Sequence, residues 1–172
     1  MRDGMRGEPE AGKRGAEELN DYVIRVFDDP AAIDAQQWNA LLDEQASSTP
    51  FMRHEYLLAM HSSASATGAT GWLPQFLAVV HDDVLVAGCP LYLKDHSYGE
   101  YVFDWAWADA YQRHGLRYYP KLLGAVPFTP VPGPRLLARD QAGRRVLLRA
   151  MRQIALEAKL SSAHLLFLDD AD

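Results

Sequence analysis

The stretch Trp72-Leu-Pro-Gln-Phe-Leu-Ala-Val-Val-His-Asp-Asp-Val-Leu-Val-Ala-Gly-Cys-Pro-Leu-Tyr-Leu93 decides the fold of this chain. It consists of two apolar, β-branched runs, 72–81 and 84–93, with Asp82-Asp83 between them, which is the pattern of a β-hairpin. Neither run alternates between apolar and polar residues, and strands that are covered on both faces have this composition. We therefore expect a hairpin inside a sheet that is flanked by helices.

Segments on either side of the hairpin predict the remaining elements. Runs of β-branched and aromatic residues indicate strands at Tyr22–Phe27, at Tyr118–Val126, where an edge strand is expected, and at His164–Leu168. Apolar residues at helical spacing indicate four helices. The first covers Ala35–Leu42, the second starts at Thr49-Pro50 and runs through Met60, the third ends at Gly115, and the fourth starts after Asp140. This order predicts the α/β (α+β) class, with a mixed, mostly antiparallel sheet flanked by helices.

The last of these helices has two distinct sides. Its apolar side, which predicts packing on the sheet, consists of Val146, Leu147, Ala150, Met151, Ile154 and Ala158. Arg145, Arg149 and Arg152 lie along another side, which we expect to face water.

The stretch Lys94-Asp-His-Ser-Tyr-Gly-Glu-Tyr-Val-Phe-Asp-Trp-Ala-Trp-Ala-Asp-Ala-Tyr111 directly follows the hairpin and concentrates carboxylates and large aromatic side chains. Aromatic side chains form the dry walls of pockets and carboxylates handle protons, so this composition is typical of a site at the end of a core strand. A simpler interpretation competes with it. Phe103, Trp107 and Tyr111 are spaced i, i+4, i+8, as on the core-facing side of an ordinary helix.

Composition and charge exclude several classes of function. The 172 residues are 48% hydrophobic and 23% charged, which is typical of one globular domain with a sizeable core. The formal net charge of -6 provides no overall positive field for DNA, a large RNA or an anionic membrane. The lone cysteine, Cys89, suits a reducing cytoplasm. No stretch approaches the roughly 18 apolar residues that span a bilayer, and no signal peptide is recognisable, so we expect a cytoplasmic protein.

The first 20 residues differ from the rest of the chain. They mix charged residues and glycine with almost no large apolar side chains, which predicts a disordered leader over residues 1–20. Met5 is an alternative start to Met1. We expect a single domain over residues 21–172.

Several idiosyncratic motifs allow a comparison with a known family. They are Pro50-Phe51 with Glu55-Tyr-Leu57, Gly71-Trp-Leu-Pro74, Pro90 to Asp104, Trp107-Ala-Asp-Ala-Tyr111, Tyr118-Tyr-Pro-Lys-Leu122, Pro127-Phe-Thr-Pro130, Gly133-Pro-Arg-Leu-Leu137 and His164-Leu-Leu-Phe167. On these motifs the chain resembles the FemAB-like N-acyltransferases of the GNAT superfamily, which are associated with peptidoglycan biosynthesis or recognition. The resemblance implies a GNAT-like lobe. It also implies two such lobes in tandem, so the chain is expected to be an N-terminal lobe that lacks its C-terminal lobe.

The resemblance further implies a donor and an acceptor. Acyl-CoA or aminoacyl-tRNA would donate the acyl group in the full-length protein, and a small-molecule or peptide amine would accept it. The glycine-rich spacing that binds a CoA pyrophosphate is absent between Arg135 and Gly143, and Asp140 would repel phosphate. We therefore expect no cofactor in this lobe. We expect no metal either, because His54-Glu55 lacks the second histidine of a zinc helix, with Leu58 in its place.

Acyl transfer to an amine needs a base for the amine proton and a donor for the oxyanion. Glu100 or Asp104 could be the base, and Lys121 could orient a carboxylate or stabilise the oxyanion. The alternatives are that Asp104 and Asp109 only cap a helix and that Lys121 only faces water. The expected substrate-binding residues are Lys94, His96, Tyr98, Tyr101, Trp105, Asp109, Tyr111, Tyr119, Thr129 and Arg135.

The expected function is N-acyl transfer to an amine, with segments 94–111 and 121–135 lining the substrate cleft. The alternative is a non-catalytic binding lobe that recognises a cell-wall precursor or a peptide, since the pyrophosphate loop is missing. A third interpretation is a lobe whose main role is to pack on its partner lobe.

Overall fold

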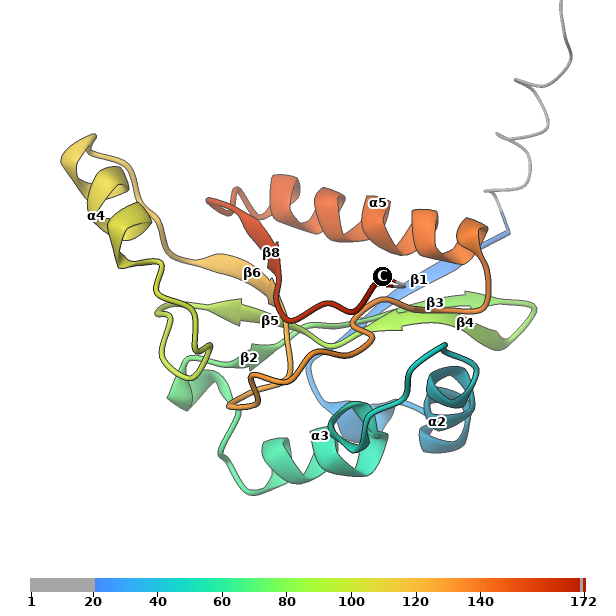
Figure 1. The fold of residues 1–172 in the computed structure, drawn as a ribbon. Coiled ribbons are helices and arrows are strands. Elements are labelled where there is room, and N and C mark those ends of the chain that lie inside the picture. The colour runs from blue at the N-terminus through green and yellow to red at the C-terminus, as the bar shows by residue number, and fades with distance from the viewer. Residues whose placement is uncertain (1–20, 171) are drawn as a thin grey trace, which may run out of the picture.

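A long β-hairpin lies at the centre of the fold, as the sequence predicts (Figure 1). In this computed structural model, which describes residues 21–170 and 172, β3 (Phe76–His81) pairs antiparallel with β4 (Val84–Cys89). The same two runs continue as β2 (Leu73–Pro74) and β5 (Leu91–Lys94), which pair in the same register. The expected leader, residues 1–20, lies outside the described residues.

The hairpin passes from one sheet into a second at Gln75 and Pro90. One sheet has the strand order β1-β3-β4-β7 and the other β2-β5-β6-β8. Proline has no N–H to donate to a ladder, so Pro90 interrupts the pairing, and the Gln75 N–H donates to the Leu91 carbonyl at 2.8 Å beyond the break. The sequence therefore predicted the pairing but not its division between two sheets.

The remaining strands complete a mostly antiparallel arrangement. They are β1 (Val23–Phe27), β6 (Lys121–Gly124), β7 (Leu137–Ala138) and β8 (Ala163–Leu165). Among the described strands only β6 and β8 pair in parallel. The predicted class, a mixed and mostly antiparallel sheet flanked by helices, is confirmed.

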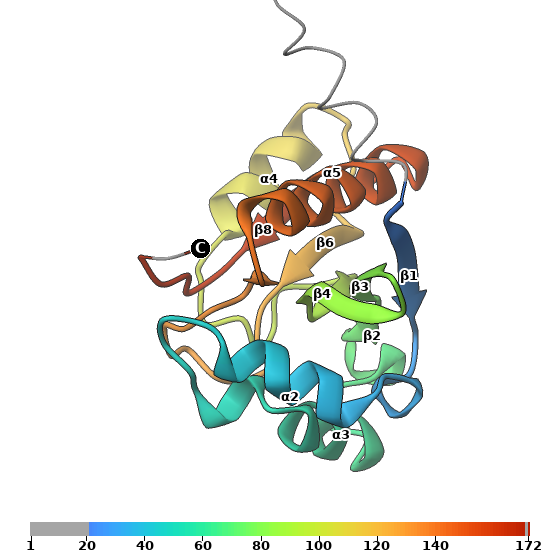
Figure 2. The same cartoon turned by 90° about the vertical axis from the view of Figure 1, so that its right-hand side faces the viewer.

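Helices cover both faces of the strands (Figures 1 and 2). On one side lie α2 (Ala35–Asp43) and α3 (His54–Ser62), and on the other lies α5 (Gln141–Glu157). Trp38 is fully buried under the first pair, and its indole N–H donates to the Met52 carbonyl at 2.9 Å. Because the hairpin is covered on both faces, its apolar runs need no polar alternation.

The predicted two-sided last helix is confirmed. Asp140 caps α5 by accepting a hydrogen bond from the Gly143 N–H at 2.7 Å. Val146, Leu147, Ala150 and Met151 are buried, whereas Arg145, Arg149 and Arg152 are exposed. Ala158, at the end of the predicted apolar side, is exposed and follows the last helical residue.

Two predicted boundaries differ from the structure. Thr49 and Pro50 start a single 3-10 turn over Pro50–Met52, and α3 begins only at His54, because Arg53 is extended. The segment expected as an edge strand contributes β6, which lies between β5 and β8. Its four residues are all buried, and the neighbouring prolines that suggested an edge lie outside the strand.

The core-facing interpretation of the aromatic stripe is wrong. Phe103 and Trp107 are 87% and 66% exposed, and α4 (Trp105–Arg113) has no buried residue. The helix itself forms as predicted and ends before Gly115, which has a φ of 69°. It projects from one end of the molecule (Figure 1). Tyr111, the third residue of the stripe, is half-buried against Tyr118, whereas Phe103 and Trp107 remain exposed.

Candidate active site

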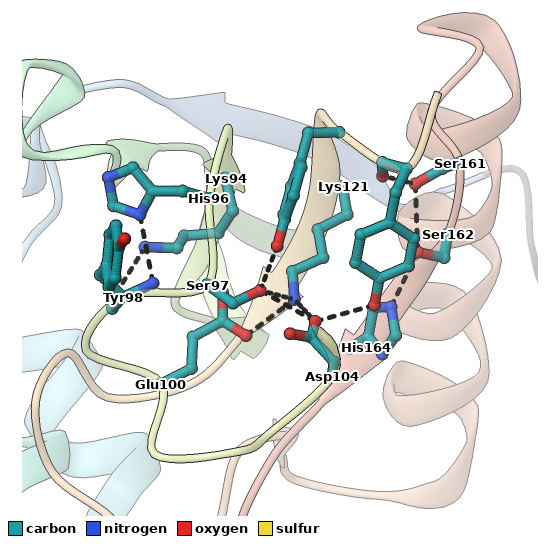
Figure 3. Close-up of polar contacts among 12 residues, drawn as sticks. Lys94, His96, Ser97, Tyr98, Glu100, Asp104, Lys121, Ser161, Ser162 and His164 are labelled. Carbon is teal, nitrogen blue, oxygen red and sulfur yellow. Dashed lines mark hydrogen bonds and ion pairs between the residues drawn. The ribbon is translucent and has the colours of Figure 1, made fainter. Parts of the chain in front are cut away.

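Lys121 lies at the centre of a polar cluster that contains the three predicted catalytic residues, Glu100, Asp104 and Lys121 itself (Figure 3). Its ammonium donates to Glu100 Oε2 at 2.8 Å, to Asp104 Oδ2 at 2.5 Å and to Ser97 Oγ at 2.9 Å. Lys121 begins β6, whereas its three partners come from the segment between β5 and α4. The three acceptors use all three ammonium protons, so the geometry suits a lysine that orients carboxylates.

The cluster is removed from water. Lys121, Glu100 and Asp104 are 1%, 2% and 8% exposed. Lys121 therefore does not face water, which was one of the two interpretations that the sequence left open. Charges buried at this depth interact more strongly than surface pairs, and each depends on its partners for compensation.

Asp104 accepts hydrogen bonds from several groups through one oxygen. Besides Lys121, the Tyr118 hydroxyl and the Ser97 hydroxyl each donate to its Oδ2 at 2.8 Å. The Tyr119 hydroxyl lies 2.7 Å from Ser97 Oγ and extends the network. Asp104 occupies the N-cap position of α4 but its side chain makes no capping bond, so the capping alternative is wrong for this residue.

The two carboxyl groups have opposite pKa shifts. Burial raises the pKa of Glu100, and the hydrogen bond from Lys121 only partly offsets this effect. Burial acts in the same sense on Asp104, but hydrogen bonds from Lys121, Tyr118 and Ser97 outweigh it and lower the pKa. Two carboxyl groups with separated pKa values are the usual basis for assigning acid and base roles.

One oxygen of each carboxylate has no hydrogen-bond partner among the described residues. These are Glu100 Oε1 and Asp104 Oδ1, and both are buried. A buried acceptor without a donor costs free energy, on the order of 1–3 kcal/mol. Such an atom is also available to a ligand N–H. Glu100 combines the free oxygen with the raised pKa, so it is the better placed of the two to take up a proton.

Lys94 is a second buried lysine beside the cluster. Its ammonium lies 3.6 Å from the centre of the Trp72 ring and donates to the Tyr98 carbonyl at 3.2 Å. Burial, together with the positive charge of Lys121, lowers the pKa of Lys94 to about 8, although Glu100 acts in the opposite sense. The charges of Glu100 and Lys121 thus act on Lys94, although Lys94 forms no ion pair with another described residue.

The predicted aromatic residues lie around the cluster rather than in it. Trp105, Asp109 and Tyr119 line an open groove of about 510 Å³ that Tyr118 also borders. Asp109 forms an exposed ion pair with Arg113 at 2.7 Å and, like Asp104, is no helix cap.

The other predicted residues of this segment lie nearby. The Tyr111 ring packs 5.2 Å from Tyr118. On the outer side, His96 stacks on Tyr98 at 4.9 Å, and Tyr98 and Tyr101 are exposed.

Thr129 and Arg135 lie outside the cluster. The Thr129 hydroxyl contacts the Tyr56 hydroxyl at 3.0 Å. The buried Arg135 guanidinium donates to the Leu166 carbonyl at 3.1 Å and to the Val131 carbonyl at 2.5 Å. The two contacts of Arg135 hold the segment after β8 against the proline-rich loop, and a substrate-binding role for Thr129 and Arg135 stays a prediction.

Three residues of the site were not among the predicted ones. Ser97 and Tyr118 connect directly to Asp104. His164 Nε2 lies 2.7 Å from Ser162 Oγ (Figure 3), and the centre of its ring lies 6.4 Å from that of Tyr118. Burial and the charge of Lys121 lower the pKa of His164. The Tyr118-Tyr119 pair just before Lys121 was a usable signal for Tyr118. Nothing in the pattern indicated Ser97, in the segment between β5 and α4, or His164, whose position depends on β8 reaching the neighbourhood of the cluster.

The described residues include no group of three or more His, Cys, Asp or Glu side chains that could hold a metal ion. No helix in this part of the chain is long and apolar enough to cross a bilayer.

Comparison with known proteins places the chain in a family. Residues 29–172 match the FemAB-like family, which is described by the words peptidoglycan biosynthesis/recognition. No curated protein and no solved structure matches the chain. The match covers most of the sequence and includes all the residues of the Lys121 cluster. The chain therefore belongs to the FemAB-like family of peptidoglycan biosynthesis/recognition proteins.

Proposed function

We propose that this chain contributes the proton-handling part of an N-acyltransferase of the GNAT/FemAB-like type, which transfers an acyl or aminoacyl group to an amine acceptor. The observation that carries the proposal is Glu100 Oε1, a buried carboxylate oxygen without a hydrogen-bond donor in a group whose pKa is raised. The family supports a role in peptidoglycan biosynthesis or recognition, so we propose a peptide or precursor amine as the acceptor.

In the proposed reaction the acceptor nitrogen attacks the carbonyl carbon of the donor. A C–N bond forms, the bond from the carbonyl carbon to the donor's leaving oxygen or sulfur breaks, and the leaving atom takes up a proton. Glu100 Oε1 receives the proton that the amine loses and passes it to the leaving atom, which restores the carboxylate. Lys121 holds the other oxygen of Glu100 in place at 2.8 Å and compensates its charge. Asp104, whose pKa is lowered by its three donors, in turn holds the Lys121 ammonium at 2.5 Å.

The groove beside Tyr118 and Tyr119 is the proposed approach for the acceptor. Both tyrosine hydroxyls belong to the hydrogen-bond network, and the same two residues border the groove. Glu100 is almost fully buried, so the amine reaches it when the segment between β5 and α4 moves. Gly99 and Tyr101 in that segment both have positive φ values, 80° and 58°, and the segment contains no regular secondary structure.

The donor is proposed to bind elsewhere than at the start of α5. Asp140 already caps that helix, and its carboxylate occupies the position where a pyrophosphate would bind the free N–H groups. Acyl-CoA or aminoacyl-tRNA would therefore be bound by other parts of a full-length protein.

The test is to assay the protein with acetyl-CoA or alanyl-tRNA as donor and a lysine-containing muropeptide as acceptor, with product detected by mass spectrometry. Glu100→Gln keeps the shape of the side chain but cannot take up a proton, so we expect a rate loss of about 10²–10⁴-fold. Glu44→Gln, which removes one surface charge paired with Arg139, is the matched control. Full activity of a folded Glu100→Gln protein would overturn the assignment.

A second candidate function is recognition without chemistry, in which the lobe binds a cell-wall precursor or peptide. The observation in its favour is that Lys121 has no ammonium proton left for an oxyanion. Calorimetry with the same muropeptide and with acetyl-CoA separates the two. Binding of muropeptide by a protein that yields no product with either donor would favour recognition, whereas turnover would favour transfer.

A further inference from the structure

The projecting end of the molecule exposes four large apolar side chains. Phe103, Trp105, Trp107 and Leu116, which we call the aromatic tip, all belong to α4 or its flanks and are mostly exposed. Several large apolar side chains exposed on one element often mark an interaction site. In Figure 1, α4 stands away from the two sheets and from the helices that cover them.

The arrangement of the tip around the helix indicates what kind of surface it contacts. Trp105 and Trp107 are two positions apart, which places them roughly 200° apart around the helix axis. Both rings are exposed, so apolar groups lie on opposite sides of the first turn. A rigid, flat protein surface would cover only one of these sides. The deformable interface of a bilayer can surround both, and it is the environment in which Trp side chains concentrate.

The charged side chains beside the aromatic tip are also complementary to a bilayer interface. Arg117 and Lys159 line a hollow of about 260 Å³ next to the C-terminal end of α4, together with Tyr119. Both cations are exposed, and neither forms an ion pair with another described residue. Asp109 on α4 is paired with Arg113, so Arg117 and Lys159 add two positive charges beside the tip, although the chain as a whole carries a net charge of -6. Unpaired cations beside exposed aromatic rings are complementary to lipid phosphates above an acyl layer.

We propose that the aromatic tip docks this protein on a lipid bilayer, with the rings in the interfacial layer and with Arg117 and Lys159 against headgroup phosphates. Docking in this orientation would bring the groove beside Tyr118 and Tyr119 close to the membrane, because Trp105 belongs to both the tip and the groove. The inference does not depend on the proposed transfer reaction, since it requires only binding.

The tryptophans allow a direct test. Trp38 and Trp72 are fully buried, so only Trp105 and Trp107 can respond to lipid. Vesicles of phosphatidylcholine with a minor part of phosphatidylglycerol should sediment the protein and shift its tryptophan emission to shorter wavelength. Brominated acyl chains should quench that emission. We expect Phe103→Ser/Trp107→Ser to weaken vesicle binding at least about tenfold, and Arg117→Glu/Lys159→Glu to remove the preference for phosphatidylglycerol.

The matched control is Val23→Ser/Ile24→Ser, which removes two exposed apolar side chains from β1, away from α4 (Figure 1). It should bind vesicles as the unchanged protein does. Absence of quenching by brominated lipid, or equal binding by the Phe103→Ser/Trp107→Ser variant, would overturn the proposal. A third result would also overturn it. If the tryptophan emission is blue-shifted before vesicles are added, and if the protein self-associates but the Phe103→Ser/Trp107→Ser variant does not, the aromatic tip is a contact between protein molecules.

Discussion

Nζ of Lys121 lies 2.5 Å from Oδ2 of Asp104, and both side chains are buried beneath the segment that leads into α4. Neither charge has bulk water as an alternative partner. The pair therefore links the start of β6 to the start of α4, two elements with few other contacts. The stability of the protein and its candidate chemistry both depend on this link.

Replacing Lys121 by Met should destabilise the protein by about 3–5 kcal/mol, because it leaves two buried carboxylates without a cation. Urea unfolding at neutral pH measures the change. The triple variant Lys121→Met/Glu100→Gln/Asp104→Asn removes all three charges and should recover most of the loss. A loss below about 1 kcal/mol in the single variant would show that water reaches the cluster.

The pH dependence of stability should reveal Asp104. Its folded pKa is lowered from 3.8, so the stability it contributes is present above 3.8 and is lost as pH falls through the folded value. Asp104→Asn should therefore be less stable than the unchanged protein at neutral pH, and the difference should shrink in acid. Urea midpoints measured from neutral pH down to the acid limit of the native state provide the comparison.

The Glu100→Gln variant is the control, because the contribution of Glu100 to stability should change with pH in the opposite direction. The folded pKa of Glu100 is raised from 4.5, so its contribution to stability is greatest below 4.5 and falls as pH rises through the folded value. The variant should gain on the unchanged protein as the pH rises. Parallel slopes for both variants would contradict the opposite shifts.

Lys94 should produce a separate effect in alkali. Its pKa is lowered from 10.5 to about 8, so the unfolded chain binds more protons than the folded one between these values. Stability should therefore rise by up to about 3 kcal/mol between pH 8 and 10.5 from this group. Lys94→Met should lack that rise. The difference between the two urea midpoint curves isolates Lys94 from other groups that titrate there, and a constant difference would disprove the shift.

Two glycines with similar backbone angles should respond differently to alanine. Gly99 and Gly115 have φ values of 80° and 69°. A Cβ at Gly99 would lie 2.5 Å from the Phe128 ring, whereas nothing lies within 4 Å of one at Gly115. Gly115→Ala should cost about 1–2 kcal/mol for the left-handed backbone alone. Gly99→Ala should cost more, and equal losses in thermal or urea unfolding would mean that Phe128 moves aside freely.

Much of the local structure was predictable because its signals are local. The apolar runs on either side of Asp82-Asp83, the Asp140 cap and the apolar side of α5 depend on residues close in sequence, and all three are confirmed. Predictions of which elements pack against each other were less accurate. The helical spacing of Phe103, Trp107 and Tyr111 carries no information on whether another element covers these side chains, and Phe103 itself precedes the first residue of α4.

The candidate site shows the same division. Glu100, Asp104 and Lys121 were recognisable as chemistry-bearing residues, and the Tyr118-Tyr119 pair was a usable signal for Tyr118. Ser97 and His164 were not recognisable, although they share the network or its surroundings.

The sequence by itself determined the two strands of the hairpin and their turn, the positions of most helices and the family. Only the tertiary structure decided that β6 lies inside its sheet, that Lys121 is buried against two carboxylates, and that α4 remains uncovered. The physical reason is that hydrophobic spacing specifies which face of an element is apolar. Burial determines the pKa values of the site and decides which surfaces remain exposed. It depends on contacts between residues far apart in the chain.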